Sequence, residues 1–382
     1  MKIVYCLNSI RGLGGVQRVT IVKVNALSAI NGNEVYVVVT DNKHSTLVQE
    51  LSPAVHLIDL DINYYKGDRG RSKIVNIFVY KQKMRRHRKL LEQFLSKLHP
   101  DVVVSVGGFE KYMLLSMHKR TWRLVREFHF VRNYRKDHSK TLFDRIVAKL
   151  TDFYDFHFKE KKYDKIVILT EEDRERNWGG WRNVEVIPNP VSFTSEETSA
   201  LIEKTVAYAG RLDPIKNCRS LVNVFKIVAG RHPDWMLKIY GEGNEYEQLK
   251  AYITELHLQD NVRLMGFSDD IRSAYCQSSI AVLSSLSEGF ALVIVEAMEC
   301  GVPVVSYQCP YGPKDLISEG KDGFLVPVGD ERLMAARICT LIEDESLRKS
   351  MGRAAKVKAQ NYHIESIVGQ WMDLFRELCA GR

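Results

Sequence analysis

The segment IAVLSSLSEGFALVIVEAMECGVPVVSY, residues 280–307, decides the fold of this chain. Residues 280–285 form an apolar run that is typical of a buried β-strand, and residues 302–307 form a second one. Between them, a stretch with helical spacing runs from about Phe290 to Glu299. A strand, a helix and a second strand in this order make a βαβ unit, in which the two strands run parallel. The segment therefore predicts a parallel sheet with helices packed against it.

The same alternation of short apolar runs and helical stretches extends through the whole chain. In the first half, strands are expected at residues 2–7, 34–39, 101–106, 123–125, 164–169 and 184–187. In the second half, strands are expected at residues 205–210, 235–241, 261–266, 280–285, 302–307 and 323–326. Helical spacing is clear between strands, for example at 16–31 and 81–98. Two such series predict two doubly wound domains of the α/β class.

The boundary between the domains is predicted within VIPNPVSF, residues 186–193, because two prolines flank Asn189 and impose an extended connection. A last stretch, residues 362–378, carries apolar side chains at intervals of three and four, which predicts an amphipathic helix that needs a docking surface. The expected organisation is a domain over residues 1–188, a second domain over residues 189–361 and a final helical segment over residues 362–382.

The composition narrows the class of protein. The 382 residues, 45% hydrophobic and 27% charged, are typical of a soluble globular chain with two cores. No apolar run approaches the roughly 20 residues that span a bilayer, and Asn8 and Arg11 interrupt the N-terminus too early for a secretory signal. The seven cysteines include no CxxC pair, which argues against a zinc site and indicates a reducing compartment. We therefore expect a cytoplasmic protein.

Positive charge is concentrated in the first half of the chain. Residues 1–190 contain 34 Lys and Arg against 21 Asp and Glu, whereas the remainder contains 21 against 26. The basic residues include the run KQKMRRHRK at 81–89. Such a face can attract nucleic acid, an anionic membrane or a phosphorylated substrate, although a single charge run is as often a solvated helix face. No nucleic-acid recognition motif accompanies the charge, so we expect no nucleic-acid partner.

The opening segment also carries chemistry-bearing residues. If its helix begins near Phe290, the amides of residues 289–292 lack partners within the helix and form an anion site at the carboxyl end of a parallel strand. Glu288 and Glu296 are about two helical turns apart, so both can face one cleft and bind sugar hydroxyls. On helix statistics alone, the more common interpretation is that Glu288 is an N-cap and Glu296 a surface residue.

A second candidate is AYAGRLDPIKN, residues 207–217, where a strand ends at Gly210 and a loop presents Arg211 and Lys216 before the next helix. Two cations on a short loop suit a diphosphate, because a guanidinium can bind two oxygens and an ammonium acts as a point charge. Two solvated loop cations are an equally good interpretation of this segment alone.

The glycine-rich segment SIRGLGGVQRVTIVKVNAL, residues 9–27, follows the first strand. Gly12, Gly14 and Gly15 stand where a phosphate-binding loop would lie, but Arg18 replaces the third glycine of a dinucleotide fingerprint. Asp41 follows the second strand, where an acid that binds a ribose would be found. NAD binding is therefore an alternative, with an incomplete fingerprint.

The segment VREFHFVRN, residues 125–133, places Glu127 and His129 just after a strand. A histidine at a strand end is more often a satisfied core or loop residue than a functional one. A histidine that faces a cleft could instead bind a sugar hydroxyl or handle a proton of the acceptor.

Taken together, these segments resemble the family-4 retaining glycosyltransferases of the GT-B fold over essentially the whole chain. The motifs that carry the resemblance are GGVQRV, EFH, VIPNPV, GRLDPIKN, GEGNEYEQL, VRLMGF, SEGFALVIVEAMECGVPVV and DGFLVPVGD. The segment CPYGPKDLI at 309–317 is similar to a variant in bacterial transferases of surface polysaccharides and lipid-linked oligosaccharides. The resemblance implies two Rossmann-like domains facing across a cleft, with the C-terminal helix crossing back to the N-terminal domain.

The resemblance also implies roles for individual residues. Arg211 and Lys216 would hold the donor diphosphate, and Glu288 would contact the donor sugar, with His129 beside it. Glu296 would bind the ribose. The other donor-binding positions that the resemblance implies are Gly14, Gly15, Gly210, Gly266, Phe267, Gly289, Phe290, Ala291 and Leu292. No metal or other cofactor is implied. Val16 and Gln17 stand where many family members carry an acidic residue, so the contacts of that loop are not carried over.

The function that the resemblance implies is transfer of a hexose or N-acetylhexosamine from a UDP-sugar, with retention at the anomeric carbon. The acceptor would be a saccharide or a lipid-linked saccharide of a cell-surface glycan such as lipopolysaccharide. The basic first half, together with mixed aromatic and basic residues at 122–165, predicts peripheral contact with an anionic membrane at the inner face of the plasma membrane. The alternatives are a UDP-sugar 2-epimerase of the same fold, an NAD-dependent oxidoreductase and a non-catalytic partner that binds nucleotide sugars.

Overall fold

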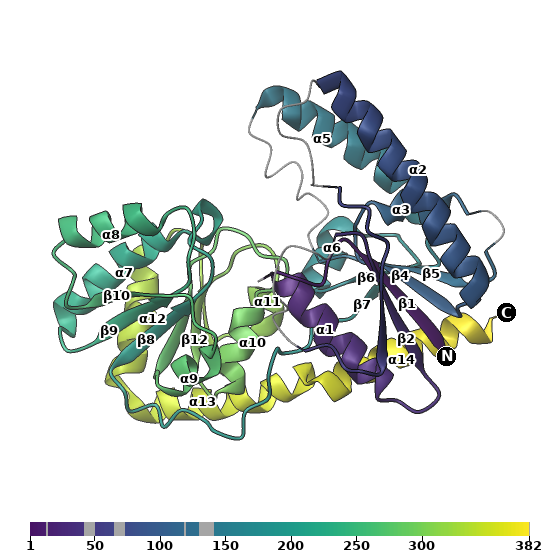
Figure 1. Ribbon diagram of the computed structural model, residues 1–382. Coiled ribbons are helices and arrows are strands. Elements are labelled where there is room, and N and C mark those ends of the chain that lie inside the picture. The colour runs from purple at the N-terminus through teal and green to yellow at the C-terminus, as the bar shows by residue number, and fades with distance from the viewer. Residues whose placement is uncertain (13, 42–49, 65–72, 118–119, 130–140, 382) are drawn as a thin grey trace. The chain divides into compact units, whose positions relative to one another are not determined.

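The structure is a computed structural model that describes residues 1–12, 14–41, 50–64, 73–117, 120–129 and 141–381 (Figure 1). Its chain divides into two compact units. Unit 1 comprises Met1–Leu169, Asp173–Pro190 and Ile364–Arg382, and unit 2 comprises Thr170–Glu172 and Val191–His363. The division after Pro190 falls inside the VIPNPVSF segment, two residues beyond the expected end of the first domain.

Unit 1 is built on a seven-stranded parallel sheet of order β3-β2-β1-β4-β5-β6-β7. Its strands are β1 (Lys2–Leu7), β2 (Glu34–Val39), β3 (Val55–Asp59), β4 (Val102–Ser105), β5 (Arg123–Glu127), β6 (Lys165–Ile168) and β7 (Val184–Val186). Six of these were expected from the sequence. The missing strand is β3, at the sheet edge, where His56 and Leu57 are exposed and break the apolar run that marks a buried strand.

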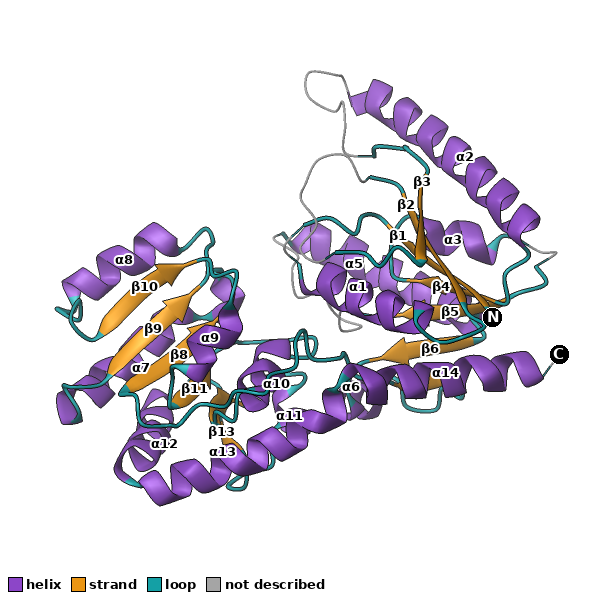
Figure 2. Ribbon diagram, turned by 60° about the horizontal axis from the view of Figure 1, so that its bottom comes forward, coloured by secondary structure: helices purple, strands orange, loops and turns teal. Residues whose placement is uncertain are grey.

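Helices cover both faces of this sheet (Figures 1 and 2). They are α1 (Gly15–Ser28), α2 (Lys73–Leu98), α3 (Glu110–Leu115), α5 (Leu142–Tyr154), α6 (Glu171–Asn177) and α14 (Ile364–Ala380). Successive side chains of a strand point to opposite faces. Tyr5 of β1 accordingly lies in a core cluster with residues of α1 and α14, whereas Val4 and Cys6 lie in a second cluster with residues of α2 and α3.

The C-terminal helix α14 is part of the core of unit 1. Its buried side chains are Ile367, Val368, Trp371, Met372, Leu374 and Phe375, which pack with β1, β2 and α1. The helix begins at Ile364, two residues later than expected, because residues Gln360–Tyr362 form a separate short 3₁₀ turn. The apolar spacing of this segment thus reflects a surface that belongs to residues more than 300 positions away in sequence.

Unit 2 is built on a six-stranded parallel sheet of order β10-β9-β8-β11-β12-β13. Its strands are β8 (Thr205–Ala209), β9 (Met236–Tyr240), β10 (Val262–Gly266), β11 (Ile280–Leu283), β12 (Val304–Tyr307) and β13 (Gly323–Val326). Its helices are α7 (Cys218–Arg231), α8 (Tyr246–Glu255), α9 (Ile271–Cys276), α10 (Leu292–Glu299), α11 (Pro313–Leu316), α12 (Glu331–Glu343) and α13 (Glu345–Ala359). Core residues of α7, α8 and α12 pack on one face of the sheet, and α9 and α10 contact strands β8, β11 and β12.

Both sheets confirm the expectation of two doubly wound α/β domains. Each sheet reverses its strand order at one point, between β1 and β4 in unit 1 and between β8 and β11 in unit 2. Ligands of such sheets bind outside the carboxyl ends of the strands at this switch point. No helix among the described residues is long and apolar enough to cross a membrane.

The burial of α14 yields a test of its docking. Phe375 is fully buried, so Phe375→Ala should lower the free energy of unfolding of unit 1 by about 3–5 kcal/mol. Gln370 lies on the exposed side of α14, so Gln370→Ala should change it by less than about 0.5 kcal/mol. Four of the five tryptophans belong to unit 1, so urea unfolding followed by tryptophan fluorescence reports mainly on this unit. Equal effects of the two substitutions would contradict the docking surface described here.

Candidate functional site

The candidate donor site lies at the switch point of the second sheet. The loop that follows β8 carries Arg211 and Lys216, and the loop that follows β11 carries Glu288. Because β8 and β11 are neighbours and parallel, both loops leave the same edge of the sheet side by side. Two segments about 70 residues apart in sequence are thus brought together by strand order alone.

Lys216 and Glu288 are in direct contact. The Nζ of Lys216 donates to Oε1 of Glu288 at 2.6 Å, and the Oγ of Ser285 donates to the same oxygen at 2.6 Å. The side chains of Lys216 and Glu288 are only 17% and 10% exposed. The Coulomb attraction between charges with this little exposure is stronger than in a surface pair. The two motifs that the sequence analysis treated separately therefore form one charged site.

Backbone contacts hold this site in place. The amide of Leu286 donates to the carbonyl of Ile215 at 2.8 Å, and the Oγ of Ser284 donates to the carbonyl of Lys216 at 2.9 Å. Asp213 caps the short turn Pro214–Lys216, because its side chain accepts a bond from the amide of Lys216. The backbone position of Lys216 is thus fixed by hydrogen bonds from residues of both loops.

Arg211 is in a different environment. Its side chain is 80% exposed and lies 3.2 Å from Asp213. Arg211 and Lys216 come from the same loop, as expected, but only Lys216 is tied to Glu288. The exposed guanidinium of Arg211 can turn toward a ligand at low cost, whereas Lys216 must exchange a short bond to Glu288 for any new partner.

The helix after Glu288 begins later than the sequence indicated. The expected start was Phe290, but α10 begins at Leu292 because Ala291 adopts the left-handed conformation at φ 63°. The amides of Gly289 and Phe290 therefore precede the helix, and the polarised amides of its first turn lie at Leu292 and Val293. Glu288 is also not the N-cap of α10. The N-cap is Ala291, which makes no side-chain hydrogen bond.

Glu296 is buried rather than on the surface. It is 3% exposed, and Ser192 of the connecting segment donates its Oγ proton to Oε1 of Glu296. One turn later, the carboxylate of Glu299 accepts bonds from Lys356, from the amide of Ser195 and from His363. The more common interpretations of Glu288 and Glu296, an N-cap and a surface residue, are therefore both wrong.

Glycines shape the loops after β9 and β10. The amide of Gly241 donates to the carbonyl of Gly266 at 2.7 Å, and a Cβ on Gly241 would lie 1.9 Å from the carbonyl oxygen of Gly210. A Cβ on Gly243 would lie 2.2 Å from the carbonyl oxygen of Leu212. Side chains at 241 or 243 would push away the loop that carries Arg211. Gly266 has a positive φ of 73°, and Phe267 beside it is 43% exposed.

The CPYGPKDLI segment, residues 309–317, forms backbone hydrogen bonds with Glu288. The amide of Glu288 donates to the carbonyl of Pro310 at 2.7 Å, and the amide of Tyr311 donates back to the carbonyl of Glu288. A Cβ on Gly312 would lie 2.4 Å from the carbonyl oxygen of Phe290. Residues 309–312 therefore brace the backbone that presents Glu288.

In unit 1, the glycine-rich loop follows β1 at the switch point of the first sheet. Gly12 has φ 115°, Gly14 is the N-cap of α1 without a side-chain bond, and the helix begins at Gly15. Asp41 follows β2, and its carboxylate accepts a bond from the hydroxyl of Thr40 at 2.7 Å. Gly14 and Gly15 thus lie where a phosphate-binding loop would. They belong to unit 1, whereas Lys216 belongs to unit 2.

Glu127 and His129 lie at the end of β5 and are buried. The Nε2 of His129 is 3.1 Å from Oε1 of Glu127, and the ammonium of Lys23 contacts the same oxygen. Lys23 is not among the residues that the sequence motifs single out. The signal for it is its place on the buried face of α1, which also includes Thr20, Val24 and Leu27. A lysine at such a position needs a buried partner.

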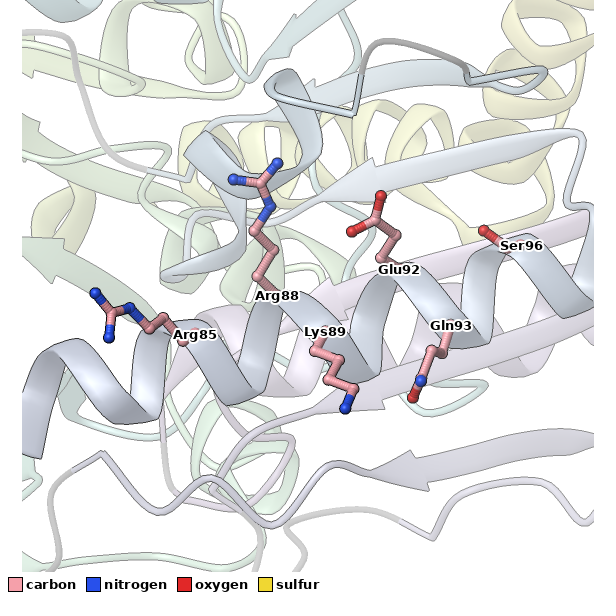
Figure 3. Close-up of a pocket in the computed structure, with 6 residues that line it drawn as sticks. All are labelled: Arg85, Arg88, Lys89, Glu92, Gln93 and Ser96. Carbon is pink, nitrogen blue, oxygen red and sulfur yellow. The ribbon is translucent and has the colours of Figure 1, made fainter.

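The surface of unit 1 carries the basic and apolar residues that the sequence indicated. One face of α2 lines a shallow pocket of about 360 Å³, formed by Arg85, Arg88, Lys89, Glu92, Gln93 and Ser96 (Figure 3). On α5 and the turn after it, large apolar side chains are exposed: Leu142, Ile146, Val147, Leu150, Phe153, Tyr154 and Phe158.

The aromatic residues expected at the interfacial surface are divided. Phe153, Tyr154 and Phe158 are exposed, whereas Trp122 and Phe156 are buried and belong to the core, with Phe128 packed against them. Phe130 and Tyr134 lie outside the described residues. The expectation that these core aromatics lie on the surface was wrong. Aromatic content alone does not show which side of a strand or helix a residue lies on.

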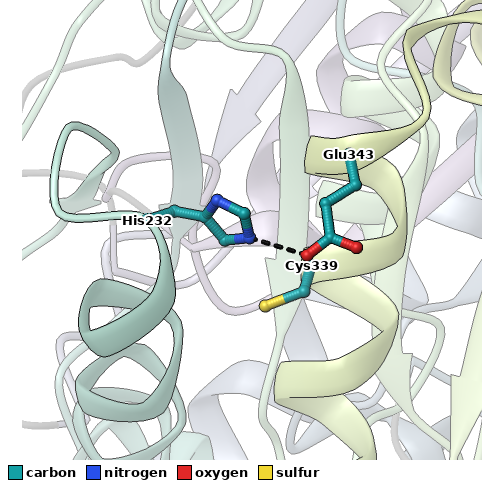
Figure 4. Close-up of side chains that lie close together, drawn as sticks. All are labelled: His232, Cys339 and Glu343. Atoms are coloured by element: carbon teal, nitrogen blue, oxygen red, sulfur yellow. Dashed lines mark hydrogen bonds and ion pairs between the residues drawn. The ribbon is translucent and has the colours of Figure 1, made fainter.

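A further group of metal-binding residue types lies just after α7 and on α12, formed by His232, Cys339 and Glu343 (Figure 4). The Nε2 of His232 is 3.0 Å from Oε1 of Glu343, and Arg231 donates to the same oxygen at 3.1 Å. Burial raises the pKa of the Cys339 thiol. The carboxylate is thus already neutralised by a cation and the thiol disfavours its thiolate form, so this group carries no assigned role.

Three comparisons with known proteins bear on identity. Residues 194–358 match the family model "Glycosyl transferases group 1". The chain is 34% identical over 224 residues to an exopolysaccharide phosphotransferase of Streptomyces coelicolor, which covers 57% of the chain and 24% of that protein. It is 27% identical over 374 residues to an uncharacterized glycosyltransferase of Haemophilus influenzae, covering 97% of the chain and 98% of that protein.

The chain therefore spans about a quarter of the first relative's length and nearly all of the second's. Among solved structures, Staphylococcus aureus TarM, bound to fondaparinux, alpha-GlcNAc-glycerol and UDP, superposes with a TM-score of 0.76 at 15% identity, covering 98% of this chain and 99% of that one. At this identity the likeness concerns the fold. Residues 194–358 are thus similar to the group 1 glycosyltransferases, and the chain as a whole has the GT-B fold of two parallel-sheet, Rossmann-like domains.

Proposed function

We propose that the chain transfers a hexose or N-acetylhexosamine from a UDP-sugar to a saccharide or lipid-linked saccharide in cell-surface glycan synthesis, with retention at the anomeric carbon. The observation that carries the proposal is the partly buried contact of Lys216, Ser285 and Glu288 at the switch point of the second sheet. It joins a cation suited to a diphosphate and a carboxylate suited to sugar hydroxyls in one site.

Binding of the donor would break the hydrogen bond between Lys216 and Glu288. A diphosphate oxygen can replace Glu288 as the acceptor for the ammonium of Lys216, and this frees the carboxylate to bind hydroxyls of the donor sugar. Arg211 can turn from Asp213 toward the same diphosphate, because its side chain is exposed. Glu296 would bind the ribose in place of its bond to Ser192.

The chemical step breaks the bond between the anomeric carbon and the phosphate oxygen and forms a bond to the acceptor oxygen on the same face. The departing phosphate oxygen takes the proton of the acceptor hydroxyl. Negative charge develops on the nucleotide diphosphate, and the cations of Arg211 and Lys216, with the amides at the start of α10, stabilise that charge. His129 would be a further catalytic residue, which binds a sugar hydroxyl or handles the proton of the acceptor. Cations in these positions can carry the role that a metal ion has in other transferases, so we propose a metal-independent reaction.

The names of similar proteins support the choice of substrates. TarM was solved with UDP and with an alpha-GlcNAc-glycerol, and the Streptomyces relative is named for an exopolysaccharide. The surface of unit 1 supports an acceptor at a membrane. Exposed apolar residues of α5 together with basic residues of α2 suit an anionic lipid surface, because apolar side chains enter the interface and cations attract the headgroups.

Substitution of the donor-site cations tests the reaction. Arg211→Ala should lower kcat by about 100-fold or more, because it removes charge that stabilises the leaving diphosphate, and should leave the melting temperature unchanged, because Arg211 is exposed. Lys216→Ala should lower kcat at least as far. Lys250 is an exposed cation of α8, and Lys250→Ala is the matched control with near-normal kcat. NMR of the product should give the same anomeric configuration as the donor.

Near-normal turnover of both donor-site variants at saturating donor would overturn the assignment of this site. An inverted linkage would reject the retaining mechanism alone. A modified sugar nucleotide formed without any acceptor would favour the 2-epimerase instead.

Metal independence is tested by chelation. Activity in 5–10 mM EDTA, roughly the excess needed to strip an adventitious divalent ion, should remain within about twofold of the untreated enzyme, because the diphosphate charge is met by Arg211 and Lys216. Added Mg²⁺ or Mn²⁺ should change the rate by a similarly small factor. Loss of activity in EDTA that Mg²⁺ or Mn²⁺ restores would show that the cations of the chain are insufficient.

Membrane contact is tested by sedimentation with anionic vesicles. Leu150→Glu on α5 should weaken binding about tenfold, since it removes an apolar side chain and adds a repelled charge. Val357 of unit 2 has the same 65% exposure as Leu150, so Val357→Glu is the matched control and should bind as the unmodified chain does. Binding should also weaken as salt is raised. Equal binding of all three proteins, or indifference to vesicles, would remove the membrane from the proposal.

A further inference from the structure

A buried ionic cluster lies inside unit 1, on the face of the sheet that α1 and α14 cover. The ammonium of Lys23, from α1, contacts Oε1 of Glu127 at the end of β5, and the two side chains are 2% and 1% exposed. The Nζ of Lys23 also lies 4.3 Å from the ring centroid of Trp371 in α14 and 5.3 Å from that of Tyr5 in β1. The cluster therefore joins four elements through one charged pair.

His129 shares the same carboxylate oxygen. Its Nε2 lies 3.1 Å from Oε1 of Glu127, and its side chain is 2% exposed. One oxygen thus faces two nitrogen groups, the ammonium of Lys23 from α1 and the imidazole of His129 from the EFH motif. Burial of three titratable groups in contact is costly unless their charges compensate. Such an arrangement therefore constrains the protonation of each member.

The charge of the carboxylate is settled by these neighbours. Burial alone would raise the pKa of Glu127, but Lys23 and His129 outweigh it and lower the pKa to about 2. Burial lowers the pKa of Lys23, and Glu127 opposes that effect. Burial, together with the charge of Glu127, keeps the pKa of Tyr5 well above its ordinary value. Glu127 is accordingly ionised at neutral pH, with Lys23 as the compensating cation.

We propose that Lys23 and Glu127 are positioning residues for His129: Glu127 orients the imidazole, and Lys23 neutralises Glu127 so that the imidazole need not hold a proton. The proposal rests on the proposed function, in which His129 is a catalytic residue. Without Lys23, the ionised Glu127 would have the imidazole as its remaining close cation, and His129 would bind its proton more tightly. A protonated His129 could no longer accept a hydrogen bond from the reacting sugar or acceptor.

The groups that face Glu127 come from each element packed around it. Lys23 comes from α1, Tyr5 from β1 and His129 from the segment after β5, while α14 contributes the uncharged ring of Trp371. Trp371 covers the ammonium of Lys23 and gains a cation–π contact from it. The docking of α14 is thereby linked to the charge state of the cluster, in addition to its apolar packing.

A histidine titration by NMR tests the positioning role without any assay of transfer. The full chain is labelled with ¹⁵N-histidine, and the His129 signals are assigned by their absence in His129→Gln. Lys23→Met should raise the pKa of His129 by about one unit or more, since it removes a nearby cation and leaves the carboxylate. Glu127→Gln should move the pKa of His129 in the opposite direction. Lys23→Arg, which keeps the charge, should restore the value of the unmodified chain.

An unchanged His129 titration in folded Lys23→Met would overturn the proposal. If Lys23→Met does not fold, the near-isosteric Glu127→Gln decides, and an unchanged titration there has the same consequence. Thermal unfolding of each variant shows whether it is folded.

A kinetic cycle then separates positioning from a merely structural ion pair. Lys23→Met should shift the acidic limb of the kcat profile to higher pH in the unmodified background, and should lower kcat by less than about twofold in a His129→Ala background, since its effect runs through His129. An equal loss of kcat in both backgrounds would assign Lys23 to stability alone and overturn the proposal. Absence of any sugar transfer by the unmodified chain would count against the proposed function, whereas the NMR titration would still decide the cluster.

Discussion

Parallel strand pairing is the constraint on which the candidate sites depend. In a parallel sheet every carboxyl end lies at the same edge, and a reversal of strand order leaves two neighbouring loops that no crossover helix separates. In unit 2 these loops follow β8 and β11, so Lys216 and Glu288 meet although 71 residues lie between them. The glycines at 241 and 243 serve the same constraint, because any side chain there would collide with the backbone of the β8 loop.

The carboxylates of Glu288, Glu296 and Glu299, on α10 and the loop before it, are each held by separate hydrogen-bond donors. Glu288 is held by Lys216 and Ser285, and Glu296 by Ser192. Burial would raise the pKa of Glu299, but bonds from Lys356, Ser195 and His363 lower it. Ser192 and Ser195 belong to the segment that follows Pro190, so the start of unit 2 is fastened to the helix that follows the donor site. Each carboxylate has its own donors, and loss of those of Glu296 or Glu299 would leave a buried charge without a partner.

The fold and much of the candidate site could be predicted from sequence, for a physical reason. Apolar runs and glycines report local structure directly, and strand order in a doubly wound sheet then brings motifs such as GRLDPIKN and SEGF together. The edge strand β3 was not predicted, because most of its side chains are exposed and give no apolar run. The start of α10 was not predicted correctly, because no residue type marks the left-handed conformation of Ala291. The neighbouring Phe290 packs against Tyr362, with 5.9 Å between the ring centroids.

Lys23 shows where sequence reasoning stops. Its spacing on α1 places it on the buried face, which raises the question of a partner, but the partner lies 104 residues away at the end of β5. In the sheet β1 and β4 stand between β2 and β5, so the contact of Lys23 with Glu127 joins two elements that the strand order keeps apart. A buried ammonium also needs polarisable cover, and Trp371 supplies it from the last helix of the chain. The helix that appears in sequence as an apolar stripe therefore completes an ionic cluster, so part of its role is electrostatic and has no periodic signature.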